Sequence, residues 1–150
     1  MSLQALTNIQ IDEYYKNESR YGGCFSTDIL NKMGKNQSKF YILNLDSSDG
    51  PGTHFVLLYM CEKDVGIYFD SYGLSPSEQV VKYLKKYRTH NIRNIGGIQH
   101  LKSSACGFYC LFLVDMLLQG KSLVDTIAMF DTRGDLWKND SILHKYFFPK

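Results

Sequence analysis

The sequence contains 150 residues, of which 44% are hydrophobic and 21% are charged. These values are typical of a single globular domain over residues 1–150, and they exclude a disordered or fibrous chain. The formal net charge is only +2, whereas nucleic-acid-binding domains usually concentrate far more positive charge on one face. The composition therefore gives no support to DNA or RNA as a partner.

The sequence also argues against membrane insertion, secretion and metal binding. No stretch approaches the roughly 18 to 20 consecutive apolar residues of a membrane span, and the N-terminus lacks a signal-peptide pattern. The cysteines form no CxxC pair and no zinc-like spacing with histidine; they are Cys24, Cys61, Cys106 and Cys110. We therefore expect reduced thiols, no metal and no cofactor. We also expect a monomer.

The N-terminal part of the chain predicts one short helix. Thr7 and Gln10 match a helix-capping box, in which the threonine hydroxyl caps the first turn and the glutamine reaches back to it. This pattern predicts a helix through Tyr15. Gly22 and Gly23 follow, and we interpret them as a break in the chain.

Three strands are predicted next. Residues 40–45 carry the aromatic and branched side chains typical of a strand, and residues 47–52 predict a turn. Residues 53–61 and 66–72 predict two further strands, joined by the polar residues 62–64. We expect these two strands to form an antiparallel hairpin at the centre of the sheet.

Helices dominate the second half. Ser75, Pro76 and Glu78 predict a helix start with Ser75 as the cap, and the helix should continue to about Tyr87. Short extended pieces are predicted at 92–95 and 98–101, a buried helix at 105–118 that ends before Gly120, and further helices at 122–130 and 141–148. The fold class is therefore α+β, with a small, mostly antiparallel sheet flanked by helices.

Cys106 is the first candidate for chemistry. A turn of small polar residues, Ser103 and Ser104 among them, leads directly into the predicted buried helix, with Cys106 at its start. Unpaired N–H groups and partial positive charge at a helix N-terminus favour the thiolate, and Gly107 permits close approach of a substrate carbonyl. A buried core cysteine is the competing interpretation, and it is the one we give Cys110.

His54 and Asp70 are the candidate partners of this thiol. His54 begins one strand of the predicted hairpin and Asp70 ends the other, so antiparallel pairing would bring the imidazole close to the carboxylate. Taken singly, each residue also fits a turn or surface position. Gln99 precedes Cys106 and could donate to an oxyanion beside the Cys106 backbone N–H, although an exposed glutamine is the simpler interpretation.

The order and surroundings of these residues resemble a known family. The segments are Gly52-Thr53-His54-Phe55, then Tyr68 through Gly73, then Gln99, then Ser104 through Cys110. They resemble the adenain family, the maturation cysteine proteases of adenoviruses with relatives in virophages and Polinton-type elements, and more distantly the SUMO proteases. The likeness extends from about Thr7 to Gly120, and residues 44–54 resemble the Polinton and virophage branch.

The resemblance implies a role for each candidate residue. Cys106 would be the nucleophile, His54 its general base and Asp70 the residue that orients the imidazole, while Gln99 and the Cys106 N–H would form the oxyanion hole. Phe55 replaces the tryptophan that many relatives carry after the histidine, so we expect an aromatic roof there. Phe55 and Gly107 would line the substrate cleft.

Two properties of the family do not transfer to this chain. Adenovirus enzymes use Glu where this chain has Asp70, which requires closer strand pairing. They are also activated by a viral peptide that is disulfide-linked to a cysteine upstream of the glutamine, and no cysteine lies between Cys61 and Cys106. Activation by DNA is equally unsupported by the low charge.

Three functions are consistent with these residues. The first is a viral or virus-derived endopeptidase that cleaves capsid precursors during virion maturation, at small-residue sites such as those after Gly, in the virion and the infected cell. The second is a protease that removes ubiquitin-like or SUMO modifiers. The third is a virion protein with the same fold that binds peptides without cleaving them, although a binding protein has no chemical need for a thiol beside an imidazole.

Overall fold

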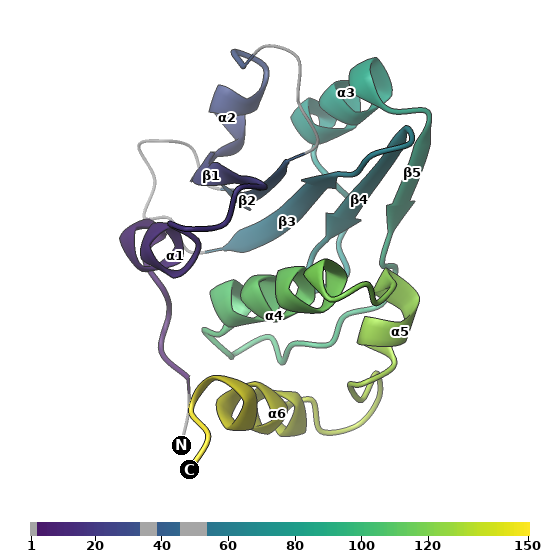
Figure 1. Ribbon diagram of the computed structural model, residues 1–150. Helices are drawn as coiled ribbons and strands as arrows, with labels where there is room; N and C mark the ends of the chain where they lie inside the picture. The colour runs from purple at the N-terminus through teal and green to yellow at the C-terminus, as the bar shows by residue number, and fades with distance from the viewer. Residues whose placement is uncertain (1–2, 34–38, 46–53) are drawn as a thin grey trace.

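The computed structural model describes residues 3–33, 39–45 and 54–150. The described residues form one five-stranded sheet with the strand order β1-β2-β3-β4-β5 and helices on both of its faces (Figure 1). The elements are α1 (Asn8–Tyr14), β1 (Tyr21–Ser26), α2 (Thr27–Leu30), β2 (Phe40–Asn44), β3 (Phe55–Met60), β4 (Val65–Phe69), α3 (Glu78–Tyr87), β5 (His90–Arg93), α4 (Cys106–Leu118), α5 (Leu123–Ile127) and α6 (Trp137–Phe147).

The sheet has an antiparallel centre and parallel edges. β3 pairs antiparallel with β2 and with β4, which confirms the predicted hairpin and its central position. β1 and β5 pair parallel with β2 and β4, respectively. The expected α+β class is confirmed, and the antiparallel pairing holds for the three inner strands.

The two faces of the sheet bury alternate residues of the same strands. In β3, Phe55, Leu57 and Tyr59 pack on the face that carries α4, whereas Val56 and Leu58 pack with α2 and α3 on the other face. Alternation of this kind follows from the two-residue period of a strand. All six residues of β3 are buried because both faces are covered.

Helix α4 is the centre of the larger face. Ten of its 13 residues are buried, which is expected for a helix that is apolar around its whole circumference. One side of α4 packs on β3 and the other contacts α5 and α6, and Figure 1 shows α4 between the sheet and α6. The predicted buried helix is therefore confirmed.

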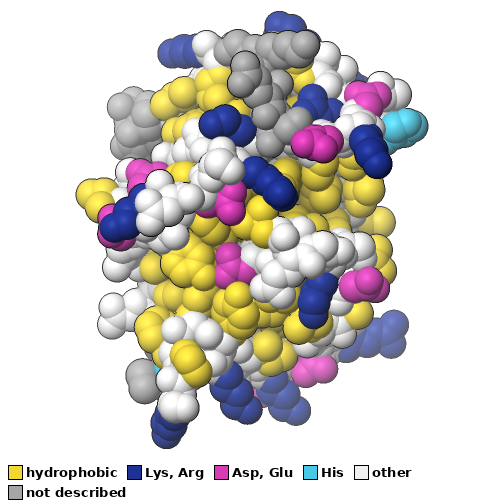
Figure 2. All heavy atoms as spheres, viewed as in Figure 1, with side chains coloured by type: hydrophobic (Ala, Val, Ile, Leu, Met, Phe, Trp, Pro, Cys, Tyr) yellow, Lys and Arg dark blue, Asp and Glu magenta, His cyan; other side chains and the backbone are white. Residues whose placement is uncertain are grey.

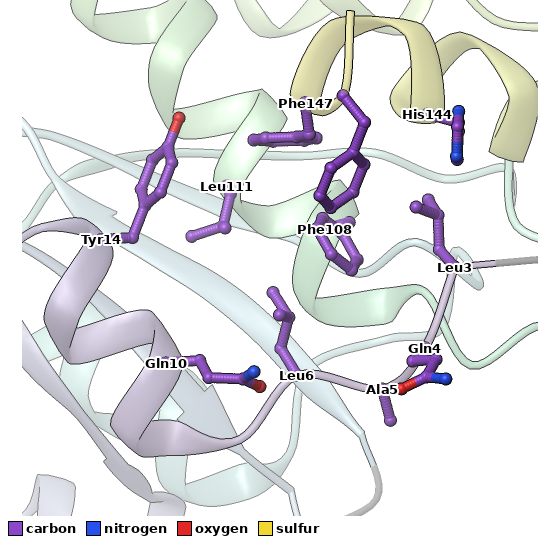
Figure 3. Close-up of a pocket in the computed structure, with 11 residues that line it drawn as sticks. Leu3, Gln4, Ala5, Leu6, Gln10, Tyr14, Phe108, Leu111, His144 and Phe147 are labelled. Atoms are coloured by element: carbon purple, nitrogen blue, oxygen red, sulfur yellow. The ribbon is translucent and has the colours of Figure 1, made fainter.

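The chain termini pack beside this central helix. Leu3 and Leu6 point toward Phe108 of α4 and Phe147 of α6, and together they line a largely apolar groove of about 700 Å³ (Figure 3). Leu6 lies against Gly107, where a Cβ atom would be 3.1 Å from the leucine Cβ. The N-terminal segment therefore covers the first turn of α4.

The described helices include no membrane span, and charges of both signs are mixed on one face of the molecule (Figure 2). No described helix is both long and apolar enough to cross a bilayer. On the face seen in Figure 2, lysine and arginine side chains alternate with aspartate and glutamate. This distribution agrees with the low net charge of +2.

Some predicted boundaries were wrong. Gly22 and Gly23 do not break the chain but lie within β1, where a side chain on Gly22 would overlap the ring of Tyr41. Ser77, not Ser75, caps α3, since its hydroxyl accepts the Val80 N–H at 3.4 Å.

Other boundaries differ less. Residues 98–101 form no strand, β5 begins before the predicted extended piece, and α6 begins at Trp137, four residues before the expected position. The helix capped by Thr7 and the strand at residues 40–45 are confirmed to within one residue. The turn predicted at 47–52 lies outside the described residues.

Gly73 allows a tight contact between the two loops beside β4. Its φ angle is +74°, and a Cβ atom there would lie 2.5 Å from the carbonyl carbon of Gly96 and 2.6 Å from the nitrogen of Gly97. We predict that Gly73→Ala lowers the free energy of unfolding by about 2 kcal/mol or more, because it combines a left-handed backbone with overpacking. Urea denaturation would measure the change.

Gly96→Ala is the matched control, since a Cβ atom on Gly96 would meet no atom within 4 Å. We expect that substitution to change stability by less than about 0.5 kcal/mol. Equal midpoints for the Gly73 and Gly96 variants would contradict the packing argument.

Candidate active site

The candidate site lies where β3 and β4 separate. The ladder between these strands ends with Leu57 opposite Phe69, although β3 continues back to Phe55. Along β3, the backbone groups of alternate residues point to the same side, and those of Phe55 point toward β4. The Phe55 N–H and C=O therefore need partners from elsewhere in the fold.

Two cysteines of α4 supply these partners. The Phe55 N–H donates to Cys106 Sγ at 3.5 Å, and the Cys110 thiol donates to the Phe55 carbonyl at 3.5 Å. Cys106 and Cys110 are one helical turn apart, so both sulfurs face the same strand. Cys106 is also the first residue of a 13-residue helix, so it lies at a helix N-terminus, where reactive cysteines are commonly found.

Burial makes the other three thiols unreactive near neutral pH. Desolvation raises the pKa of Cys24 to about 12 and that of Cys61 to about 11. The pKa of Cys110 is raised well above its ordinary value, first by complete burial and then by the nearby Cys106 and Asp70. Cys110 therefore remains a thiol, as its hydrogen bond to the Phe55 carbonyl requires.

His54 and Asp70 meet across the same opening. His54 Nε2 lies 2.9 Å from Asp70 Oδ1, and the side chains are 14% and 1% exposed, respectively. Burial lowers the pKa of His54, but hydrogen bonds to Asp70 and to Cys106, together with their negative charges, outweigh it and raise the pKa to about 9. The predicted approach of His54 and Asp70 therefore occurs, with Cys106 next to the same imidazole.

The second ring nitrogen of His54, Nδ1, is buried and makes no hydrogen bond to Asp70. Since Nε2 is occupied by Asp70, Nδ1 is the nitrogen that can exchange a proton with the Cys106 thiol. This is the arrangement that nucleophilic catalysis by a cysteine requires.

Two residues that the sequence did not single out support the pair. Tyr72 stacks on the imidazole of His54, with ring centroids 4.6 Å apart and planes 20° apart, and its backbone N–H donates to Asp70 Oδ1 at 2.8 Å. Asn94 accepts from the Asp70 N–H at 3.0 Å and donates to the Asp70 carbonyl at 2.7 Å. Tyr72 could have been suspected because it follows Asp70 by two residues, whereas no pattern marks Asn94.

Gln99 is buried, not exposed. Its side chain is only 2% exposed; Oε1 accepts a hydrogen bond from the Ser71 hydroxyl, and Nε2 donates to the Ser103 carbonyl at 2.9 Å. An amide nitrogen has two protons, and the second makes no hydrogen bond in the described part of the chain. Gln99 is therefore held against the turn that precedes Cys106.

The two expected cleft residues have other surroundings. Phe55 is 4% exposed and its ring belongs to the main core, so Phe55 contributes its backbone to the site and does not form an open aromatic roof. Gly107 is buried, and its close contact is with Leu6. Tyr72, not Phe55, is the aromatic ring that lies against His54.

The described residues contain no metal-binding cluster. No group of three or more histidine, cysteine, aspartate or glutamate side chains among them is arranged to hold a metal ion. The four cysteines, all of which lie in the described residues, form no disulfide bond.

Comparison with known proteins finds similarity to a viral cysteine protease. Over 109 residues, the chain is 28% identical to a cysteine protease of African swine fever virus; the alignment covers 65% of this chain and 40% of that protein. No protein-family model matches the chain. The chain is therefore similar in sequence to a viral cysteine protease and corresponds to less than half of its length.

The same viral protease shares the fold. Its crystal structure, described as the pS273R protease, matches with a TM-score of 0.65 and 20% identity, over 93% of this chain and 67% of that one. A selenomethionine form matches with a TM-score of 0.63 and 18% identity, over 93% and 68%. The fold seen here is therefore the fold of that protease.

The hydrogen bonds of His54 predict an unusual titration. Because its pKa is raised from 6.5 to about 9, we expect its ring signals in NMR to titrate near pH 9, and Asp70→Asn to move the midpoint down. The stabilisation that this interaction contributes is fully present below pH 6.5 and is lost as the pH rises through about 9. A midpoint near 6.5 in the unmodified chain would contradict the hydrogen-bonded arrangement.

Proposed function

We propose that this chain is a cysteine endopeptidase in which Cys106, His54 and Asp70 act as nucleophile, base and orienting acid. The observation that carries the proposal is the meeting of three groups at one opening of the sheet. Cys106 Sγ accepts a backbone hydrogen bond, and both Cys106 and Asp70 hydrogen-bond to His54. The similarity to a viral cysteine protease supports the same reading.

The reaction follows from these positions. His54 Nδ1 takes the thiol proton, or already holds it in an ion pair, and Cys106 Sγ attacks the peptide carbonyl carbon. The resulting oxyanion is stabilised by the Cys106 N–H and the Gln99 side-chain amide. His54 then gives its proton to the leaving amine, which leaves a thioester on Cys106.

Water completes the cycle. His54 removes a proton from a water molecule, the hydroxide attacks the thioester, and the Cys106 thiolate leaves with the protonated imidazole restored beside it. Asp70 holds the ring through Nε2 throughout. Tyr72 covers one face of the ring and so limits its rotation.

The biological role we propose is maturation of a virus particle. The chain would cleave capsid precursor proteins at small-residue sites, such as those after Gly, and act in the virion and the infected cell as adenain-type proteases do. Support comes from the His54, Asp70, Gln99 and Cys106 order and from the similarity to a protease of African swine fever virus.

Thiol alkylation tests the activated pair. We expect iodoacetamide to label Cys106 selectively well below pH 8, and His54→Ala to remove that labelling, since the base is then missing. Mass spectrometry would identify the labelled residue. Cys106→Ala is the control, and it should leave no fast-reacting thiol because burial raises the pKa of Cys24 and Cys61 to about 12 and about 11. Labelling that follows an ordinary thiol in both chains would refute the pair.

Cleavage of a capsid precursor tests the activity itself. We expect the unmodified chain to cut the precursor, Cys106→Ala to abolish cutting, and Gln99→Ala to lower kcat by about 10²–10³-fold, as for loss of an oxyanion donor. Gel electrophoresis and mass spectrometry of the products would give the rate and the cleavage site. A precursor that stays intact while iodoacetamide labels Cys106 would refute the capsid substrate and leave the activated thiol standing.

A further inference from the structure

The loop that carries Gln99 is anchored at both ends by α6. Asn139 Nδ2 donates to the carbonyl of Ile98, directly before Gln99, at 2.7 Å. Asp140 Oδ2 accepts from the hydroxyl of Ser103, three residues before Cys106, at 2.7 Å. Two consecutive residues of one helix therefore contact the two ends of the segment that contributes the oxyanion donors.

The anchoring side chains are buried. Asn139 is 0% exposed and Asp140 is 5% exposed. A buried carboxylate is costly unless it is hydrogen-bonded, and Asp140 meets this requirement with two hydroxyl groups, from Ser103 and from Tyr109 of α4, both at 2.7 Å. Asp140 thus connects α6, the loop and the second turn of α4.

Ser103 links Asp140 to Gln99 through hydrogen bonds. Because its hydroxyl proton points to Asp140, its Oγ atom is free to accept the Ala105 N–H at 3.1 Å, which shapes the turn into α4. Its carbonyl accepts one proton of the Gln99 amide at 2.9 Å. The orientation of the second Gln99 proton therefore depends on where Ser103 is held.

We propose that Asn139 and Asp140 are positioning residues that hold Gln99 and the start of α4 in the geometry of an oxyanion hole, an inference that rests on the proposed protease function. They act through Ile98 and Ser103 and do not touch the substrate. Their removal should slow acyl transfer to Cys106 without affecting the nucleophilicity of its thiol, because the Cys106–His54–Asp70 contacts do not include α6.

Two chemical probes separate these effects in the full chain. p-Nitrophenyl acetate acylates a thiolate through a tetrahedral oxyanion: the S–C bond forms, the ester C–O bond breaks and nitrophenolate leaves. Iodoacetamide alkylates the same sulfur by displacement of iodide, without an oxyanion. We expect Asp140→Asn to slow acylation by about tenfold or more and to change alkylation by less than about twofold. Ser103→Ala removes only a hydroxyl group, and we expect the same effects on the two rates.

Asp115 provides the matched control. It is a carboxylate on α4 that also accepts tyrosine hydroxyls, from Tyr14 at 2.7 Å, Tyr15 at 2.9 Å and Tyr146 at 3.0 Å, but it lies near the other end of the helix. Asp115→Asn should leave the ratio of the two rates unchanged. The Gln99→Ala, Asp140→Asn double variant should be no slower in acylation than Gln99→Ala alone.

An NMR measurement tests the positioning without any activity. The Gln99 side-chain amide signals should be dispersed and slow to exchange in the unmodified chain, and should shift and exchange faster in the Asp140→Asn and Ser103→Ala variants, but not in Asp115→Asn. Unchanged Gln99 signals, or equal losses of acylation and alkylation, would overturn the proposed role. Altered Gln99 signals in a chain whose Cys106 is never acylated would uphold the positioning and refute the protease function.

Discussion

The packing of α4 against β3 is the contact on which the candidate site depends. β3 is buried on both faces and α4 around most of its circumference, so neither element can move without opening the core. The first turn of α4 meets β3 where the ladder to β4 has ended. There the sulfurs of Cys106 and Cys110 satisfy the Phe55 backbone groups that the sheet leaves unpaired.

This arrangement gives the two cysteines opposite hydrogen-bonding roles. Cys106 receives a hydrogen bond at the helix start, whereas Cys110 donates one from a completely buried position. The N–H and the C=O of one residue, Phe55, contact the two sulfurs, so the thiol of Cys110 helps to fix the backbone beside the N–H that donates to Cys106 Sγ. The two sulfurs therefore differ in their surroundings although they belong to adjacent turns of one helix.

Much of the fold and of the central site could be predicted because the relevant signals are local. The turn residues 62–64 join two paired strands, with His54 directly before one and Asp70 directly after the other. The run of apolar residues after Cys106 defines a buried helix. β1 was missed because Gly22 and Gly23 usually interrupt strands. Here the missing side chain makes room for the Tyr41 ring, a tertiary contact that no local pattern reveals.

The supporting residues were harder to predict for the same reason. Asn94 contacts Asp70 from 24 residues away, and Asn139 and Asp140 contact the Gln99 loop from 41 and 37 residues away. Each is a polar residue that would fit a solvated surface equally well. Only the folded chain brings these side chains into the interior.

The distance along the chain between Cys106 and α6 has a consequence for biosynthesis. Under the proposed function, the nucleophile Cys106 and its base His54 are synthesised before Asn139 and Asp140. A nascent chain that ends between them would contain a thiol and an imidazole without an ordered Gln99 loop. Gln99 and the Cys106 N–H would reach their final positions only when α6 docks. Under the same proposal, peptide-bond hydrolysis would begin only after α6 has docked, which would limit premature cleavage by the nascent chain.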